Sequence, residues 1–456
     1  MNLKPSSVMS NFLQQAKTAV QQKNWFLVNQ YLQQFILESK SNKTTSISQN
    51  DSVDLLENTD LDVAIDLAIE VLENGDFQER WEISKLFKQI GVPAIAPLIK
   101  IIKNEDIDVE KRWFVTRILS DFNHQEVVEV LANIIVSSDV EDLQAMAADA
   151  LAILGADAVD SLTNLLAKPE SRLLATKALA QINSVKTITS LLSVVKDDDN
   201  EVRLAAISAL SNYCDSRIPI VLISSLKDTA STVRKESVIG LATYVNLEKE
   251  LGLVKLLEPL LWDINFEVCQ QAAIALGKIG TNTAATALFE LLKTITVPVL
   301  LKIDAVRALG WIETQESLEY LQSLLGYNFL VAENYQQQIV NEIIVALGKI
   351  RSPKFQSKAT DILIEFIKSS NSMLKSSPVK KSLALALGYL GDIRTLDYLI
   401  QLLADEDHSV RLHCVAAMKQ LTPEKAYQKL VSLSQQTTLN SQLKIGIATA
   451  LAEWNN

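Results

Sequence analysis

The sequence predicts an all-α solenoid of stacked helical pairs, and two observations lead to this prediction. One helical phrase, clearest as Ala275-Leu276-Gly277-Lys278-Ile279-Gly280, occurs twelve times in the 456 residues, at spacings of 28 to 40 residues. Repeats of this length are typical of arrays in which each helical pair buries its apolar face against the next pair. The composition agrees, because 48% of the residues are apolar whereas glycine (13) and proline (10), which interrupt helices, are scarce. We therefore expect a superhelix of about twelve helical pairs.

Every copy of the phrase has an apolar residue at the same position, and we expect it to fill the seam between neighbouring repeats. Further strong copies begin at Ala308, Ala346 and Ala386, and in each of them the seam leucine is followed by glycine. The twelve seam residues are Leu86, Leu119, Leu151, Leu179, Leu210, Leu241, Leu276, Leu309, Leu347, Leu387, Met418 and Leu451.

Three segments follow one another along the chain. Residues 1–39 contain two short amphipathic helices, the second with Asn24 as its expected N-cap, and we expect them to form a small helical hairpin. Residues 40–60 are rich in Ser, Thr, Asn and Lys, and we expect a flexible linker because so polar a tract buries little apolar area. Residues 61–456 form the solenoid.

One repeat, residues 185–214, shows the expected unit most clearly. Apolar residues at helical spacing predict a first helix over residues 185–195 and a second over residues 202–210. Between them, the acidic turn of residues 197–200 ends the first helix and supplies an N-cap for the second. We expect the same order in each repeat.

Charge is unevenly distributed along the chain. The net charge is −11, and residues 61–160 alone have 20 acidic side chains against 8 basic ones. Without a basic stripe the chain is a poor candidate for nucleic-acid binding, which depends on neutralising phosphates. The acidic stretch has two interpretations: a solvated cap at the end of the solenoid, or a surface that attracts a basic partner.

A basic residue recurs seven positions before the seam residue in eight of the twelve repeats. We expect these cations to pair with acidic turn residues of their own or the adjacent repeat, as an exposed ladder worth under about 1 kcal/mol per pair. A row that binds phosphate is the alternative, although the neighbouring Asp residues weaken the positive field it would need. The eight residues are Arg112, Arg172, Arg203, Arg234, Lys302, Lys380, Arg411 and Lys444.

Catalytic and metal-binding patterns are missing from the sequence. It has no glycine-rich phosphate loop, and its three histidines lack the spacing that places two ligands on one helical face. Cys214, Cys269 and Cys414 fall in different repeats, too far apart for one cluster if the solenoid prediction is right. We therefore predict no catalytic residues and no metal site. Cys269 takes the place of the recurrent cation in its repeat, so it is either a small buried filler or a ligand shared with a partner.

Two repeats are longer than the rest, with extra residues near 326–335 and 369–378. Insertions in repeat arrays are often found on the binding face, so we predict a partner-binding surface there. Its residues would be Tyr327, Phe329, Tyr335, Lys375 and Lys380. The alternative is that the helices are longer and the aromatic rings are buried.

Acidic turns followed by Val-Arg, as in Val202-Arg203, Val233-Arg234 and Val410-Arg411, give residues 61–456 a resemblance to the HEAT-repeat family. Two further segments, residues 74–81 and 111–114, are similar to cyanobacterial HEAT-repeat proteins related to bilin (phycocyanobilin) lyase subunits. The resemblance implies a HEAT-type solenoid, and it implies partners such as phycobiliproteins or carriers of iron–sulfur clusters.

These observations lead us to expect a non-enzymatic protein-binding scaffold or assembly factor that holds another protein on its concave face. One alternative is a phycobilin lyase-like subunit that attaches bilin to phycobiliproteins, for instance in a phycobilisome. The other is a partner of an iron–sulfur carrier that shares Cys269 as a ligand. We expect no cofactor of its own, no nucleic acid, no membrane span and a cytoplasmic location, since no signal peptide is apparent and cysteines are few. The partner's identity and the oligomeric state stay open.

Overall fold

The computed structural model describes residues 5–44, 58–329, 331–436 and 438–454. Within these ranges the chain is helical without any β-strand, and its helices follow one another as stacked pairs. The structure thus confirms the predicted all-α solenoid. It contains two compact units, Met1–Tyr213 and Cys214–Asn456.

In its described residues, 5–44 and 58–213, the first unit contains an N-terminal hairpin and five helical pairs. Its helices are α1 (Pro5–Gln21), α2 (Trp25–Thr44), α3 (Asn58–Asn74), α4 (Phe77–Ile90), α5 (Ile95–Ile102), α6 (Val109–Leu119), α7 (Gln125–Ser137), α8 (Glu141–Leu154), α9 (Val159–Leu165), α10 (Pro169–Gln181), α11 (Thr187–Ser193) and α12 (Asn200–Leu210). Short 3₁₀ turns, η1 (Val92–Ala94) and η2 (Gly155–Ala158), lead into α5 and α9.

The N-terminal hairpin lies against the first helical pair. Asn24 begins α2 as expected, because its side chain accepts a hydrogen bond from Leu27 N at 3.1 Å. Helix α2 contacts both α3 and α4, and Asn29 Nδ2 donates to Glu79 O at 3.0 Å. Most of the predicted linker, residues 45–57, lies outside the described residues, so the division of the chain at residues 40–60 stays a prediction.

The second unit contains seven helical pairs. Its helices are α13 (Ile218–Ser225), α14 (Ser231–Leu241), α15 (Glu248–Leu251), α16 (Leu253–Leu257), α17 (Phe266–Ile279), α18 (Asn282–Lys293), α19 (Val299–Ile312), α20 (Gln315–Leu325), α21 (Glu333–Gly348), α22 (Pro353–Lys368), α23 (Ser377–Leu390), α24 (Leu396–Leu402), α25 (His408–Leu421), α26 (Pro423–Ser434) and α27 (Ser441–Trp454). Its 3₁₀ turns are η3 (Val245–Leu247), η4 (Glu258–Trp262), η5 (Ser372–Lys375) and η6 (Ile393–Thr395).

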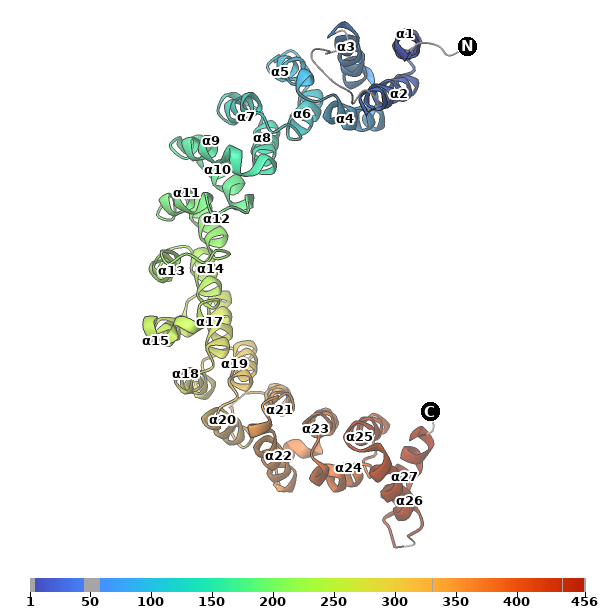
Figure 1. Ribbon diagram of the computed structural model, residues 1–456. Coiled ribbons are helices and arrows are strands. Elements are labelled where there is room, and N and C mark those ends of the chain that lie inside the picture. The colour runs from blue at the N-terminus through green and yellow to red at the C-terminus, as the bar shows by residue number, and fades with distance from the viewer. Residues whose placement is uncertain (1–4, 45–57, 330, 437, 455–456) are drawn as a thin grey trace. The chain divides into compact units, whose positions relative to one another are not determined.

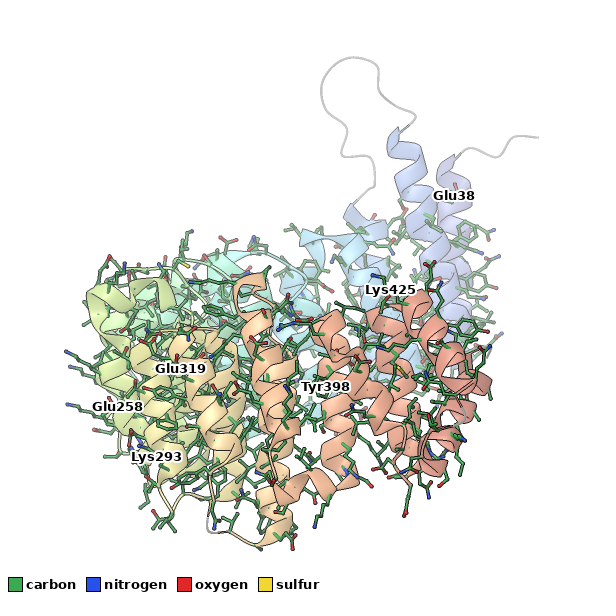
Figure 2. The ribbon with its side chains drawn as sticks, turned by 90° about the horizontal axis from the view of Figure 1, so that it is seen from below. Glu38, Glu258, Lys293, Glu319, Tyr398 and Lys425 are labelled. Atoms are coloured by element: carbon green, nitrogen blue, oxygen red, sulfur yellow. The ribbon has the colours of Figure 1, made fainter. Side chains whose placement is uncertain are left out.

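In the second unit the two helices of each pair lie in two different rows. Helices α17, α19, α21, α23 and α25 follow one another on the hollow side of this unit, and α18, α20, α22 and α24 lie behind them (Figure 1). The row of first helices, α18, α20, α22 and α24, carries charged side chains, among them Lys293 of α18 and Glu319 of α20 (Figure 2). The seam residues lie between the rows, and Leu276 and Leu309, for example, are completely buried. The predicted seam residues therefore form the core of the unit, except Leu451 in α27, which is only half-buried; Ile447 and Ala450 are buried in that helix instead.

The acidic turns have the predicted capping role. Asp199 ends the turn before α12, and its carboxylate accepts from Glu201 N at 2.8 Å. Asp407 caps α25 in the same way through Ser409 N at 2.8 Å. A side chain at this position satisfies a backbone N–H that has no partner within the helix, which is worth about 1 kcal/mol.

Candidate functional site

The recurrent basic residue links the two helices of its own repeat. In Arg172, Arg203 and Arg234 the guanidinium donates to the carbonyl oxygen six residues earlier, at 2.7 to 2.8 Å. The accepting oxygen belongs to Leu166 directly after α9, and to Asp197 and Asp228 in the turns that follow α11 and α13. The position is thus a structural brace in these repeats.

The predicted ladder to the adjacent repeat is also present, but it is more buried than expected. Arg172 pairs with Asp197 at 2.7 Å, Arg234 pairs with Asp263 at 2.6 Å, and Lys380 pairs with Asp405. The Arg234 and Asp263 side chains are only 11% and 7% exposed, so the expectation of an exposed ladder is wrong there. The bidentate hydrogen bonds between these two raise the pKa of Arg234 and lower that of Asp263.

Lys302 departs furthest from an exposed cation. Its ammonium is completely buried and donates to Leu292 O at 3.1 Å and Thr294 O at 2.7 Å. Its burial lowers the pKa of the ammonium group. The ring of Phe329 covers it, with its centroid 5.5 Å from Nζ.

Two uncharged residues act as the brace where the cation is missing. Cys269 Sγ donates to Asp263 O at 3.1 Å, and Gln144 Nε2 donates to Ser138 O at 2.7 Å, each six residues earlier. Burial raises the pKa of the Cys269 thiol, which keeps it protonated. To serve as a shared ligand, the sulfur would first have to leave this hydrogen bond. Within the described residues no group of three His, Cys, Asp or Glu side chains is arranged to hold a metal ion.

The two aromatic residues at the start of the first insertion pack against each other, with Phe329 buried and Tyr327 partly buried. Phe329 is 1% exposed, and Tyr327 meets it edge-on with ring centroids 5.0 Å apart. The Tyr327 hydroxyl donates to Lys293 O at 3.3 Å. The Gln336 side chain accepts a hydrogen bond from Phe329 N through Oε1 and donates one to Tyr327 O through Nε2. The insertion folds back over the buried Lys302 ammonium, so Phe329 has no surface to offer a partner in this structure.

The other three predicted partner residues are spread over the second unit. Tyr335 is 44% exposed at the start of α21, and Lys375 is exposed in η5. Lys380 pairs with Asp405 of the adjacent repeat. No interaction among the described residues joins Tyr335 to either lysine. Tyr335 and Lys375 therefore remain as predicted partner contacts, but the five residues do not form one cluster.

A groove of about 920 Å³ lies elsewhere, along the second helices of the second unit. It is lined mainly by α17, α19, α21 and the C-terminal part of α23. These helices approach closely because each phrase glycine faces the phrase alanine of the next repeat. A Cβ added at Gly277, Gly310 or Gly348 would lie only 2.9, 2.8 or 2.6 Å from that alanine. The glycines thus fix the spacing of the helices that line the groove.

The residue after each of these three glycines, and after Gly388 in the next phrase, projects from this face. In chain order these residues are Lys278, Trp311, Lys349 and Tyr389, and all four line the groove and are exposed. Trp311 is 52% exposed and Tyr389 is 57% exposed. Reading the phrase one position beyond its glycine would have found this row, in which a cation alternates with an aromatic ring.

Acidic side chains in the groove already have partners, whereas several cations do not. Glu342 pairs with Arg307, with oxygen–nitrogen distances of 2.9 and 3.0 Å. The Glu313 carboxylate accepts from the backbone N–H groups of Arg351 and Ser352, both at 2.9 Å. In the part of the chain that the structure describes, the charged groups of Lys278, Lys349 and Arg351 have no acidic partner. The groove therefore has a positive local field in a chain of net charge −11.

The repeats match the family model for HEAT repeats over residues 95–174, 167–242 and 373–452, which together make up half of the chain. The chain belongs to the HEAT-repeat family. No curated protein matches it in sequence.

Two known structures have a similar fold. A chain of a homology model of the full-length AP-3 complex, in an intermediate open conformation, superposes with a TM-score of 0.55 at 11% identity, over 100% of this chain and 93% of that one. A chain from the complex in which Kap95p binding switches the loops of RanGDP gives 0.51 at 12% identity, over 99% and 66%. No helix in the described ranges is long and apolar enough to span a membrane. The resemblance to bilin lyase subunits gains no support from these matches and stays a prediction.

Proposed function

We propose that this chain is a non-enzymatic protein-binding scaffold whose partner docks in the groove of the second unit. The exposed aromatic side chains of Trp311 and Tyr389 carry the proposal. Soluble proteins rarely keep several large apolar side chains exposed along one groove unless another surface covers them, and Trp and Tyr are enriched among the residues that dominate binding energy.

The cations beside these rings add specificity. Lys278, Lys349 and Arg351 favour a partner with complementary negative charge, and such charges chiefly speed encounter and exclude wrong partners. The scaffold role also agrees with the fold, because an α-solenoid presents an extended surface to its partners. The two structures of similar fold come from an AP-3 complex and from Kap95p bound to RanGDP, both of them protein assemblies.

Position-specific photo-cross-linking tests the proposal. The full chain would carry a benzophenone amino acid at position 311 or 389 and would be irradiated in extract of its source cells. A matched control pair at Trp262 and Tyr427 lies outside the groove, and both side chains are partly exposed. We expect a protein adduct from the groove positions alone. Equal adducts from groove and control positions, or none from the groove, would contradict the proposed function.

A further inference from the structure

The groove residues of successive repeats form a regular series. Lys278, Trp311, Lys349 and Tyr389 occupy the same position in four consecutive phrases, one on each of α17, α19, α21 and α23. Packed helices lie about 8–10 Å apart, and the glycine–alanine contacts keep these four in close contact. An occupant that lies across the helices therefore meets one groove side chain about every 8–10 Å.

This spacing distinguishes the possible conformations of a bound segment. A polyproline II helix has three residues per turn and a rise of about 3.1 Å, so residues on one face recur about every 9 Å. Same-face residues of a β-strand recur at about 6.7 Å, and an α-helix advances about 5.4 Å per turn. Among the regular conformations, polyproline II places one residue per turn opposite one residue per repeat.

The alternation of lysine and aromatic side chains along the groove indicates which residues a bound segment presents to it. The lysines at the first and third positions have no acidic partner of their own, and each can bind a carboxylate. The aromatic rings at the second and fourth positions are exposed, and aromatic-lined grooves bind proline-rich segments. The order along the groove is then carboxylate, proline, carboxylate, proline, at every third residue.

We propose that the groove binds an acidic, proline-rich segment of a partner protein in the polyproline II conformation. Its groove-facing residues lie opposite Lys278, Trp311, Lys349 and Tyr389 in turn, with Arg351 adding charge near the third position. This inference rests on the proposed function, because it names the partner chemistry of the same groove.

Single-stranded nucleic acid also combines charge with flat rings, but the groove suits it less well. The unpaired lysines lie two repeats apart, or about 18 Å, whereas nucleic-acid affinity depends on neutralising many closely spaced phosphates. Arg307 is already paired with Glu342 and Asp304, which reduces the charge available to phosphates.

A pair of synthetic peptides tests the proposal by fluorescence anisotropy with the full chain. The first is a fluorescein-labelled proline peptide with glutamate at positions 1 and 7, which places both carboxylates on one face. The second has the same composition with glutamate at positions 1 and 5, which places them on different faces. We expect the first peptide to bind at least about tenfold more tightly, with an affinity that falls as salt rises. Equal affinity of the two peptides would overturn the inference.

Charge-reversal variants identify the lysines involved. Lys278→Glu with Lys349→Glu should weaken binding of the first peptide by at least about tenfold, and a peptide with lysine at positions 1 and 7 should restore it. The control pair, Lys255→Glu with Lys425→Glu, makes the same charge change at exposed sites outside the groove and should leave binding unchanged. Equal losses in both pairs would refute the assignment. The melting temperature of each variant shows whether it is folded. If the variant Lys278→Glu with Lys349→Glu unfolds, Lys278→Ala with Lys349→Ala takes its place in the binding assay.

Other occupants give different results. Tighter binding of an oligothymidine than of the first peptide would assign the groove to nucleic acid and overturn the inference. A dimer in sedimentation that Lys278→Glu with Lys349→Glu dissociates would assign it to a second copy of this chain. If groove positions cross-link a protein but the peptide does not bind, the partner chemistry is wrong while the proposed function stands. If neither occurs, both are wrong.

Discussion

Replacing Gly348 with alanine should destabilise the second unit, although alanine is intrinsically the better helix former. In an open helix interior this change stabilises by up to about 1 kcal/mol. Here the new Cβ would lie 2.6 Å from both Cα and Cβ of Ala386 in α23, the second helix of the next repeat. Ordinary carbon–carbon contacts lie at about 3.5–4.0 Å, so α21 and α23 would have to separate by about 1 Å.

The size of the effect follows from these two opposing terms. Overpacking a tight contact typically costs about 1–3 kcal/mol, and no side-chain rotation can relieve a clash with backbone. Because the contact is with backbone, we take the upper part of this range, about 2–3 kcal/mol; less the gain of up to about 1 kcal/mol in helix propensity, the expected net loss is about 1–2 kcal/mol. For a unit of this size, that loss lowers the melting temperature by about 2–8 °C. The same separation moves Lys349 away from Tyr389 and should weaken binding in the groove.

Thermal denaturation followed by circular dichroism measures the loss, with two comparisons. Gly326→Ala is the matched control, because its nearest neighbour to an added Cβ is Ser323 O at 3.9 Å and its φ is −95°. We expect that variant to be as stable as the wild type or slightly more stable. Adding Ala386→Gly to Gly348→Ala should recover only part of the lost stability, because it removes the clashing methyl group but leaves Cα of residue 386 at 2.6 Å. If Gly348→Ala were as stable as Gly326→Ala, the glycine would not be setting the helix spacing and the reasoning would be refuted.

Two further predictions concern the braces between helices. Arg234→Ala should lower the free energy of unfolding, measured by urea denaturation, by about 3–5 kcal/mol, because it leaves the Asp263 carboxylate buried without its partner. The control, Lys235→Ala, breaks the exposed pair with Glu267 and should cost under about 1 kcal/mol. Equal costs would mean that the Arg234 pair is solvated. For Lys302, burial lowers the folded-state pKa below the ordinary value of 10.5 for a lysine, so between these two pKa values the unfolded chain binds more protons. The free energy of unfolding should therefore contain a contribution that rises with pH up to about 10.5, and Lys302→Met should remove that contribution. If the variant kept the pH slope of the wild type, the Lys302 amine would titrate normally.

The repeat fold was predictable because it depends on local pattern. Seam residues recur at a fixed position, and acidic turns precede the second helices, so pairing and capping followed from the sequence. The burial of the braces was not predictable in the same way. The sequence places a cation near the start of eight of the twelve second helices, but whether that cation is exposed depends on the neighbouring repeat. At Lys302, the inserted segment with Phe329 closes the site.

The groove was missed for a different reason. The insertions draw attention because Tyr327 and Phe329 stand out there as extra aromatic residues, but Phe329 is buried and Tyr327 packs edge-on against it. Trp311 and Tyr389 lie inside the regular phrase and look like ordinary helix positions. Their exposure arises because the preceding glycine brings the helices together and leaves the next side chain on the open face. A comparison of phrases position by position would have revealed the alternation, but not which face it occupies.

The most direct test of the central claim is the affinity of the cross-linked partner for two double variants of the full chain. Trp311→Ala with Tyr389→Ala removes the groove rings, and Trp262→Ala with Tyr427→Ala removes one Trp and one Tyr outside it. Interface aromatic residues commonly contribute about 2 kcal/mol or more, so we expect the groove pair to raise Kd by at least about thirtyfold. The control pair should change Kd by less than about threefold, with both variants folded. A groove pair that binds the partner as tightly as the wild type would contradict the claim that this groove is the binding surface.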